Sequence, residues 1–262
     1  MKEPVLFKTR ELLKLLDHHE IVVGAGEKRF VFLEIKNAEG ISDFKIETME
    51  DSALEIVVLQ QVSLELDTLS DIQIKAGKNS SIKLTFVQGG GKLAHLKIDA
   101  DVIGENAQVQ IRGLQNARRA QKLSFEVNTN HLVPHSQSDL QVWCIASDEA
   151  RSIFNGTITI EKGAHHTEAY QKNKNLLLSN RATIDTFPKL FIFNDDVKCA
   201  HGSSVSQLEP EQFYYLQSRG IGADDAEKML LSGFMHQAFS WITNAETKQM
   251  LEERFGIREE GF

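Results

Sequence analysis

The chain contains 262 residues, of which 41% are hydrophobic and 25% charged, with 17 Gly, 4 Pro and 2 Cys. This length and apolar fraction indicate a folded chain with a substantial core, and they exclude a disordered, collagen-like or disulfide-stapled protein. The 29 basic and 37 acidic residues give a net charge of −8, which argues against a general nucleic-acid-binding surface.

The sequence also indicates where the protein works. Its longest apolar runs are shorter than the roughly 18 residues that a membrane span requires. The N-terminal leucine cluster is interrupted by charges, unlike an export signal. The cysteines at positions 144 and 199 are expected to be reduced thiols, so we expect a cytoplasmic protein.

The first predicted region, residues 1–50, combines a short helix with strands. Thr9 is a suitable N-cap, and Leu12, Leu13 and Leu16 follow it at helical spacing. Residues 21–35 have the pattern of two strands joined by a glycine-containing turn, which we interpret as a hairpin. The Gly-Ala-Gly of this turn lacks the third glycine and the following helix of a phosphate-binding loop.

The second predicted region, residues 51–208, has alternating apolar and polar residues. The alternation is clear in residues 82–86, 123–127 and 140–144, as in β-strands with one face in a core. A loose repeat accompanies the strands, in which a small residue at a turn precedes an apolar residue by two places. The aligned small-residue positions are Ser80, Ala107, Ser138, His166, Ala182 and Ser203.

The spacing of this repeat predicts the fold. The intervals range from 16 residues (His166 to Ala182) to 31 (Ala107 to Ser138), which is too irregular for a propeller but suits a solenoid with loops of variable length. A β-sandwich is the alternative, but Pro-Gly and Asn-Gly hairpin turns are scarce. The sequence therefore favours a mainly β protein with a right-handed parallel β-helix core.

The third predicted region, residues 209–262, has helical periodicity. Pro210 is expected at the start of one helix and Gly220 just after its end. A second helix is expected from near Asp224, and a third from after Asn244 to Gly256. This C-terminal bundle of short α-helices can cap the open end of the β-helix or present a partner-binding surface, and the pattern leaves both open.

Cys199 and His201 form the first candidate site. A thiolate and an imidazole suit a soft metal or an iron–sulfur species, but two ligands are incomplete, so other loops or a partner chain must supply the rest. The two residues also share a strand face with Val197, which favours a structural role in the core. The nearby Asp195 and Asp196 keep a thiol protonated, and a Cys–His–Asp nucleophile is disfavoured because no nucleophile elbow is present.

Histidines and carboxylates provide two further candidates. His131, His135 and the pair His165–His166 could bind zinc or iron, but sequential residues on a strand point to opposite faces, which favours ordinary surface or corner histidines. The pairs Asp99 with Asp101 and Asp195 with Asp196 could instead serve a β-helix enzyme acting on a polysaccharide or a small polar substrate.

Residues 163–240 resemble a known family. The most specific motifs are NLLLS (175–179), DDVKCAHG (195–202), QL (207–208) and FYYLQSRGI (213–221). Together they resemble the SufB/SufD family of the SUF iron–sulfur cluster assembly system, and the SufD branch in particular. Members of this family are usually well over a third longer, with an N-terminal helical region that has little counterpart here.

The resemblance implies a scaffold subunit that is not itself an enzyme. It would pair with a SufB-like subunit or with itself and would dock the ABC-type ATPase SufC. No cofactor would be bound stably, although an iron–sulfur cluster could form transiently at a subunit interface. Cys199 and His201 match the family's Cys and His near that interface, and His201 is the stronger candidate for an iron or cluster ligand. Residues 210–239 match the ATPase-docking helices, with the expected anchors Phe213, Tyr214, Tyr215, Met229 and Phe234.

Overall fold

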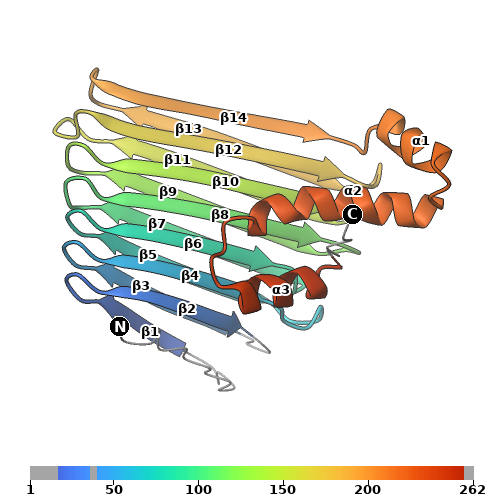
Figure 1. The fold of residues 1–262 in the computed structure, drawn as a ribbon, viewed down its shortest axis with the longest axis horizontal. Helices are drawn as coiled ribbons and strands as arrows, with labels where there is room; N and C mark the ends of the chain where they lie inside the picture. Colours follow the sequence, from blue (N-terminus) through green and yellow to red (C-terminus); the bar gives the residue numbers. More distant parts are fainter. Residues whose placement is uncertain (1–16, 36–39, 257–262) are drawn as a thin grey trace.

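Two parallel β-sheets of seven strands each make up most of the described chain (Figure 1). The computed structural model describes residues 17–35 and 40–256. The helix expected after Thr9 lies outside these residues. The odd-numbered sheet contains β1 (Asp17–Val23), β3 (Gly40–Thr48), β5 (Thr68–Ala76), β7 (Leu93–Val102), β9 (Lys122–His131), β11 (Arg151–Ile160) and β13 (Thr183–Ile192). The even-numbered sheet contains β2 (Lys28–Ile35), β4 (Ala53–Gln60), β6 (Ser81–Gln88), β8 (Gln108–Ala117), β10 (Gln137–Ala146), β12 (Thr167–Leu177) and β14 (Val197–Ser206).

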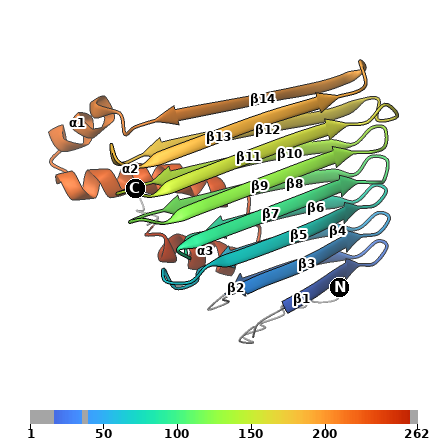
Figure 2. The ribbon, with the colours of Figure 1, turned by 180° about the vertical axis from the view of Figure 1, so that it is seen from behind.

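The connectivity identifies the fold as a parallel β-solenoid. Consecutive strands alternate between the two sheets, and each strand pairs in parallel with the strand two places along the chain (Figures 1 and 2). Two sheets face each other as in a sandwich, but a sandwich is built from antiparallel pairs, and these pairs are parallel. The expected β-helix core is therefore confirmed.

The turn at residues 24–27 is a corner of this solenoid, so the hairpin interpretation was wrong. The strands that flank it, β1 and β2, belong to different sheets. Gly26 has φ +70°, a conformation that glycine adopts without steric cost. A tight turn leads equally well to a partner strand or to a facing sheet, and local sequence does not distinguish the two outcomes. Two of the strands before residue 51, β2 and β3, pair directly with β4 and β5, which follow it.

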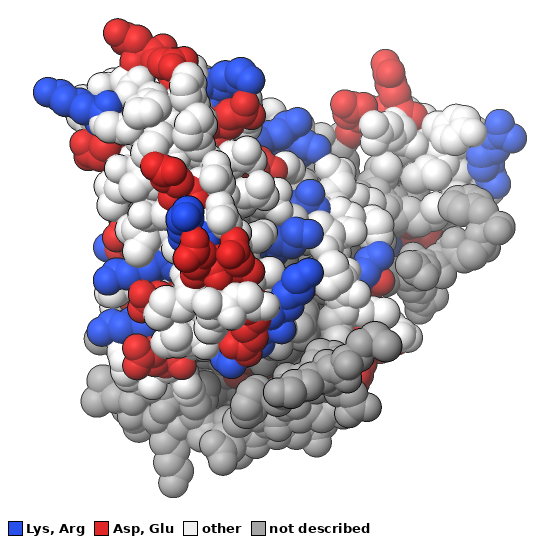
Figure 3. Space-filling view, turned by 60° about the vertical axis from the view of Figure 1, so that its left-hand side comes forward, with Lys and Arg blue, Asp and Glu red and all other residues white. Residues whose placement is uncertain are grey.

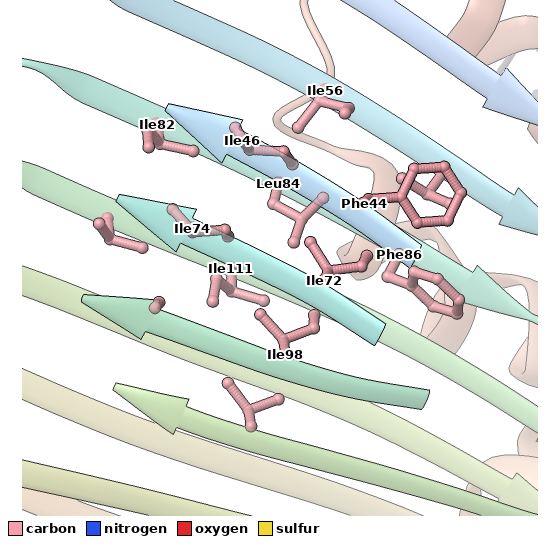
Figure 4. Packing of buried hydrophobic residues seen from close by; sticks show 14 of the residues in the cluster. Phe44, Ile46, Ile56, Ile72, Ile74, Ile82, Leu84, Phe86, Ile98 and Ile111 are labelled. Carbon is pink, nitrogen blue, oxygen red and sulfur yellow. The ribbon is translucent and has the colours of Figure 1, made fainter. Parts of the chain in front are cut away.

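The core lies between the two sheets. Every second residue of a strand points inward, and β7, β9 and β11 alternate regularly between buried and partly exposed positions. Aliphatic and aromatic side chains from both sheets interdigitate, as Figure 4 shows for Phe44, Ile72 and Leu84. Burial of this apolar surface is the main force that holds the stack together.

The corners after the odd-numbered strands share one backbone feature. A residue with left-handed φ occupies each of several consecutive corners, and backbone hydrogen bonds join each corner to the next, as from Asn79 N to Glu105 O at 2.8 Å. Side chains of this position also bond between coils, from Asn79 Nδ2 to Asp51 Oδ1 and from Asn106 Nδ2 to Asn79 Oδ1. The left-handed residues at these corners are Asp51, Asn79, Asn106, His135 and His166.

These corners correct part of the predicted repeat. Ser80 and Ala107 do follow a left-handed residue directly. In the next coil that position is Ser136 rather than Ser138. His166 is itself a left-handed residue, Ala182 lies at the opposite corner, and Ser203 lies within β14. The aligned positions do not match the corners throughout because the corner loops differ in length. The alternation of residues along the strands gives no information about loop length.

Three helices follow the last strand: α1 (Pro210–Ser218), α2 (Ala223–Phe239) and α3 (Ala245–Arg254). Pro210 begins α1 as expected, Gly220 follows it with φ +86°, and the Asn244 side chain caps α3 by accepting from Thr247 N. Figure 1 shows α2 and α3 against the outer face of the even-numbered sheet, beside its strands rather than over the end of the stack. Of the two roles left open, these helices therefore do not cap the end of the stack.

An apolar cluster fixes the helices to the sheet. Outward residues of the even-numbered strands, including Leu114, Trp143 and Ile145, are buried beneath Met235 and Phe239 of α2. Polar contacts extend this interface along the stack, from Trp241 Nε1 to Thr85 Oγ1 at 2.7 Å and from Thr243 N to Glu55 Oε1 at 2.7 Å. Among the described helices, none has the length and apolar character needed to cross a membrane.

Candidate functional site at the open end of the solenoid

The stack ends at β13 and β14, which we call the open end. Within residues 17–35 and 40–256, no further strand pairs with the outer edge of either one, and no helix covers them (Figures 1 and 2). Such edges present unpaired backbone N–H and C=O groups, which are a template for strands of another chain. The inward positions of this last coil therefore lie close to the surface.

Cys199 and His201 both occupy inward positions of β14. Cys199 lies in register with Ala169, and His201 with Gln171, so the expectation that the two share a face is confirmed. Cys199 is half-buried against a small apolar cluster that contains Ile160 and Ala169, and burial raises the pKa of its thiol. His201 is exposed. Both cysteines are free, and Cys144 in β10 is fully buried, which raises its pKa to about 11.

The interior behind this pair is polar. Gln171, Asn173 and Asn175 point inward from β12 and are buried. Both polar atoms of the Asn173 side chain are hydrogen-bonded: Nδ2 donates to Val142 O at 3.2 Å, and Oδ1 accepts from Asn175 Nδ2 at 2.6 Å. The side-chain oxygens of Gln171 and Asn175, however, have no hydrogen-bond partner among the described residues. Polar groups thus replace aliphatic ones as the stack approaches its end.

Exposed apolar side chains surround the open end. Phe187, Phe191 and Phe193 are 49%, 50% and 54% exposed, and Val205 of β14 is also exposed. A shallow hollow of about 420 Å³ lies over β10, β12 and β14 of the other sheet and is lined by Tyr170, Gln171, Ala200 and His201, among others. Sequence reasoning missed these aromatic residues. Their alternation along β13 was a usable signal, because Phe187 and Phe191 fall on the outward face, where polar residues are expected.

Three of the four aspartates considered for a β-helix enzyme, Asp99, Asp101 and Asp196, contact side chains of neighbouring coils. Asp196 Oδ2 lies 3.0 Å from His166 Nδ1 at the corner before β14. Asp99 and Asp101 lie on the outer face of β7, where each accepts a hydrogen bond at 2.8 Å from an amide of β9, Asn128 and Asn130 respectively. These pairs join neighbouring coils, so the positions proposed for a polysaccharide-cleaving site have a structural explanation.

The four histidines considered as metal ligands, His131, His135, His165 and His166, occupy two different environments. His131 is buried in the core, where its Nδ1 and Nε2 lie 2.8 Å from Ser136 Oγ and Ser138 Oγ, and burial lowers its pKa to about 4. His135, His165 and His166 lie together at a corner. The argument that His165 and His166 must point apart was wrong, because they lie in a turn instead of a strand. Among the described residues, no group of three or more His, Cys, Asp or Glu is arranged in the structure so that it could hold a metal ion.

The residues expected to contact an ATPase differ in exposure. Tyr214 and Tyr215 of α1 are 70% and 60% exposed, and α1 has no buried residue. Phe213 and Met229 are partly buried. Phe234 packs against the cluster that holds α2 on the sheet.

Comparison with known proteins decides the family. Residues 7–234 match the family described as SUF system FeS cluster assembly, SufBD core domain. The chain belongs to the SufBD family. It is 33% identical over 174 residues to the iron–sulfur cluster assembly protein SufD of Escherichia coli, which covers 66% of this chain and 41% of that protein. It is 32% identical over 187 residues to a SufBD family protein of Synechocystis, covering 71% of this chain and 41% of the relative.

These matches support the SufD-like character of the chain. SufD of Bacillus subtilis is 38% identical over 118 residues, covering 45% of this chain and 27% of that protein. The chain thus spans less than half the length of these curated relatives. The description of the family refers to iron–sulfur cluster assembly by the SUF system.

Proposed function

We propose that this SufBD protein is a scaffold subunit that pairs with a second SufBD solenoid, either another copy or a SufB-like paralogue, through its open end. A SufC-type ABC ATPase docks on the C-terminal helices, and an iron–sulfur cluster is assembled as cargo at the seam between the solenoids. The observation that carries this proposal is the position of Cys199 and His201 on the last, uncovered coil.

The chemistry of the open end supports pairing. Apolar side chains that are about half exposed gain free energy when a partner covers them, at about 25 cal/mol per Å² of apolar area. The strand edges gain hydrogen bonds in the same contact. A second solenoid would therefore bring two sets of thiol and imidazole groups together, which would supply the ligands that a single chain lacks.

The protonation state of Cys199 fits a site that is completed only by its cargo. Burial raises the pKa of this thiol, so the free chain holds it protonated and unreactive near neutral pH. Iron binding displaces the proton because the thiolate is the ligand. His201 needs no such displacement, since a neutral imidazole already presents a lone pair.

The two exposed tyrosines make α1 the expected contact for the ATPase. Aromatic residues carry much of the binding energy in protein interfaces, and Tyr214 and Tyr215 contribute almost nothing to the fold. A hollow between α1 and α2, lined by Tyr215, Leu216 and Leu230, adjoins them. Phe234 acts indirectly in this scheme, because it holds α2 against the sheet.

Co-purification with a SufC-type ATPase tests the docking surface. Removing residues 209–262 would expose the apolar cluster beneath α2, so point variants are sharper. Tyr214→Ala with Tyr215→Ala is expected to abolish ATPase binding without changing the unfolding curve. Gln249→Ala, on an exposed position of α3, is the matched control and should bind normally. Normal binding by the double tyrosine variant would contradict the docking assignment.

The seam is tested in the same complex. Phe191→Glu with Phe193→Glu is expected to prevent association with a second SufBD chain in sedimentation experiments while leaving ATPase binding unchanged. His201→Ala should keep both partners and lower the transfer of iron–sulfur clusters to an apoprotein. Full cluster transfer by this variant would show that His201 is not a cluster ligand.

A further inference from the structure

Three imidazoles meet at the solenoid corner that precedes β10 and β12, and we call His135, His165 and His166 the histidine corner. The ring centroids of His135 and His166 lie 4.8 Å apart, those of His165 and His166 5.4 Å, and those of His135 and His165 6.1 Å. These turns lie on the left of Figure 1, and Figure 3 brings this side forward, where acidic and basic side chains are interspersed.

Coil stacking explains why these residues meet. His135 and His166 occupy the same left-handed corner position in consecutive coils, each with φ +57°. His135 N donates to His165 O at 2.9 Å, and His166 N donates to Asp196 O at 2.7 Å, so backbone bonds hold three successive corners in register. Earlier coils have Asp51, Asn79 and Asn106 at this position, and their side chains bond to one another. Replacing that amide ladder by imidazoles leaves ring nitrogens available for another ligand.

The ring spacing suits a single transition-metal ion. Metal–imidazole bonds of about 2.0–2.1 Å place the centroids of two rings on one ion about 4.5–5.3 Å apart for bond angles of about 90–110°. The distances of 4.8 Å and 5.4 Å lie within or at the upper limit of this range, and the 6.1 Å between His135 and His165 is longer, so one of these two rings must move to share the ion. The donor atoms do not converge as the rings lie. The His166 side chain is 53% exposed, however, and exposed rings reorient quickly by rotation about their side-chain bonds.

Asp196 provides an independent feature of such a site. Its Oδ2 lies 3.0 Å from His166 Nδ1. A carboxylate that accepts from one ring nitrogen fixes the tautomer and leaves the lone pair on Nε2, which is the usual arrangement behind a histidine ligand. Borderline divalent ions such as Zn²⁺ and Co²⁺ prefer imidazole ligands. We therefore propose that His135, His165 and His166 bind one such ion, with Asp196 orienting His166.

This site is separate from Cys199 and His201, so its test does not depend on the proposed assembly role. The experiment is a Co²⁺ titration of the full chain without a polyhistidine tag, followed by visible absorption and by calorimetry. We expect one ion per chain and no sulfur-to-cobalt charge-transfer band. His135→Asn and His166→Asn should each weaken Co²⁺ binding by about tenfold or more, and Asp196→Asn by about tenfold.

The chain offers matched substitutions for this titration. Asparagine already occupies the same left-handed position as Asn79 and Asn106, so the histidine variants should fold normally. His18→Asn is the control, because His18 Nδ1 lies 2.9 Å from Asp43 Oδ2 and its side chain is 52% exposed, which reproduces the His166–Asp196 pair in another coil. Cys199→Ser with His201→Asn reports any binding at the open end.

A second measurement uses the wild-type protein, so its result does not depend on whether the variants fold. Zn²⁺ should protect His135, His165 and His166 from carbethoxylation, read by mass spectrometry, while His18 continues to react. Equal modification of all four histidines with and without Zn²⁺ would overturn the proposal. So would Co²⁺ binding that survives the His135 and His166 variants or disappears only in the Cys199 and His201 variant.

Discussion

The early coils and the last coils of the solenoid have different interiors. Between β3 and β6 the inward side chains in the middle of the strands are aliphatic or aromatic, such as Phe44, Ile72 and Leu84, and buried polar residues such as Gln60 and Gln88 lie toward the strand ends. In β12 they are Gln171, Asn173 and Asn175, and in β14 they include Cys199 and His201. Each coil of a solenoid contacts only its neighbours, so one end can lose apolar burial without weakening the other. The early coils therefore contain most of the large apolar side chains of the core, and the last coil contains the candidate site.

The largest expected effect comes from the aromatic core. Phe125 is 2% exposed, and its ring centroid lies 6.1 Å from that of Phe86 and 6.0 Å from that of Phe154. Phe125→Ala should lower the free energy of unfolding by about 3–5 kcal/mol, measured by urea denaturation. The half-buried Leu190 of β13 is the comparison site, and Leu190→Ala should cost clearly less. Equal losses would show that the last coil is as well packed as the core.

His131 marks the transition between the two interiors and predicts a pH effect. Its pKa is lowered by burial from 6.5 to about 4, so the unfolded chain binds a proton between these values and the folded chain does not. Stability should therefore fall by about 3 kcal/mol as the pH is lowered from about 6.5 to 4, because of this group alone. Denaturation curves at several pH values would measure it.

The neighbouring coil provides the matched variant for this measurement. Val102 is in register with His131, so His131→Val places the side chain of that coil at the same inward position. The difference in pH dependence between the two proteins isolates His131 from the carboxylates, which also titrate at low pH. Parallel curves for wild type and variant would contradict the assigned burial effect.

A smaller effect is expected within the polar interior. Gln171→Leu removes a buried side-chain oxygen without a hydrogen-bond partner among the described residues, together with one long bond from Nε2 to Gly156 O at 3.4 Å, and should stabilise the fold by about 1 kcal/mol. Asn173→Leu is the control, since that amide both donates and accepts inside the stack, and its loss should be destabilising. Thermal unfolding of both variants checks this. Destabilisation by Gln171→Leu would indicate that this side chain has a role in packing.

Much of the fold could be predicted because the relevant signals are local. Alternation assigned inward and outward positions correctly in β6, β9 and β10, and helix boundary signals located Pro210, Gly220 and Asn244. The turn after β1 was misread because a hairpin and a solenoid corner use the same residues. The exposed aromatic residues of β13 were missed, although the position of Phe187 and Phe191 on its outward face was a usable signal.

The candidate sites, too, could be predicted only in part from the sequence. The shared face of Cys199 and His201 followed from strand alternation. The meeting of His135 with His165 and His166 did not, because residues some thirty positions apart become neighbours only when the coils stack.

By itself, the sequence determined which side chains point into the stack, where the helices begin and end, and the family to which the chain belongs. Only the tertiary structure decided which sheet each strand joins, that the helices cover an outer face instead of the end, and which corner residues meet. The physical reason is the distance along the chain over which each interaction acts. Side-chain alternation and helix capping act between residues close in the chain, whereas coil stacking is decided by burial of the whole interior.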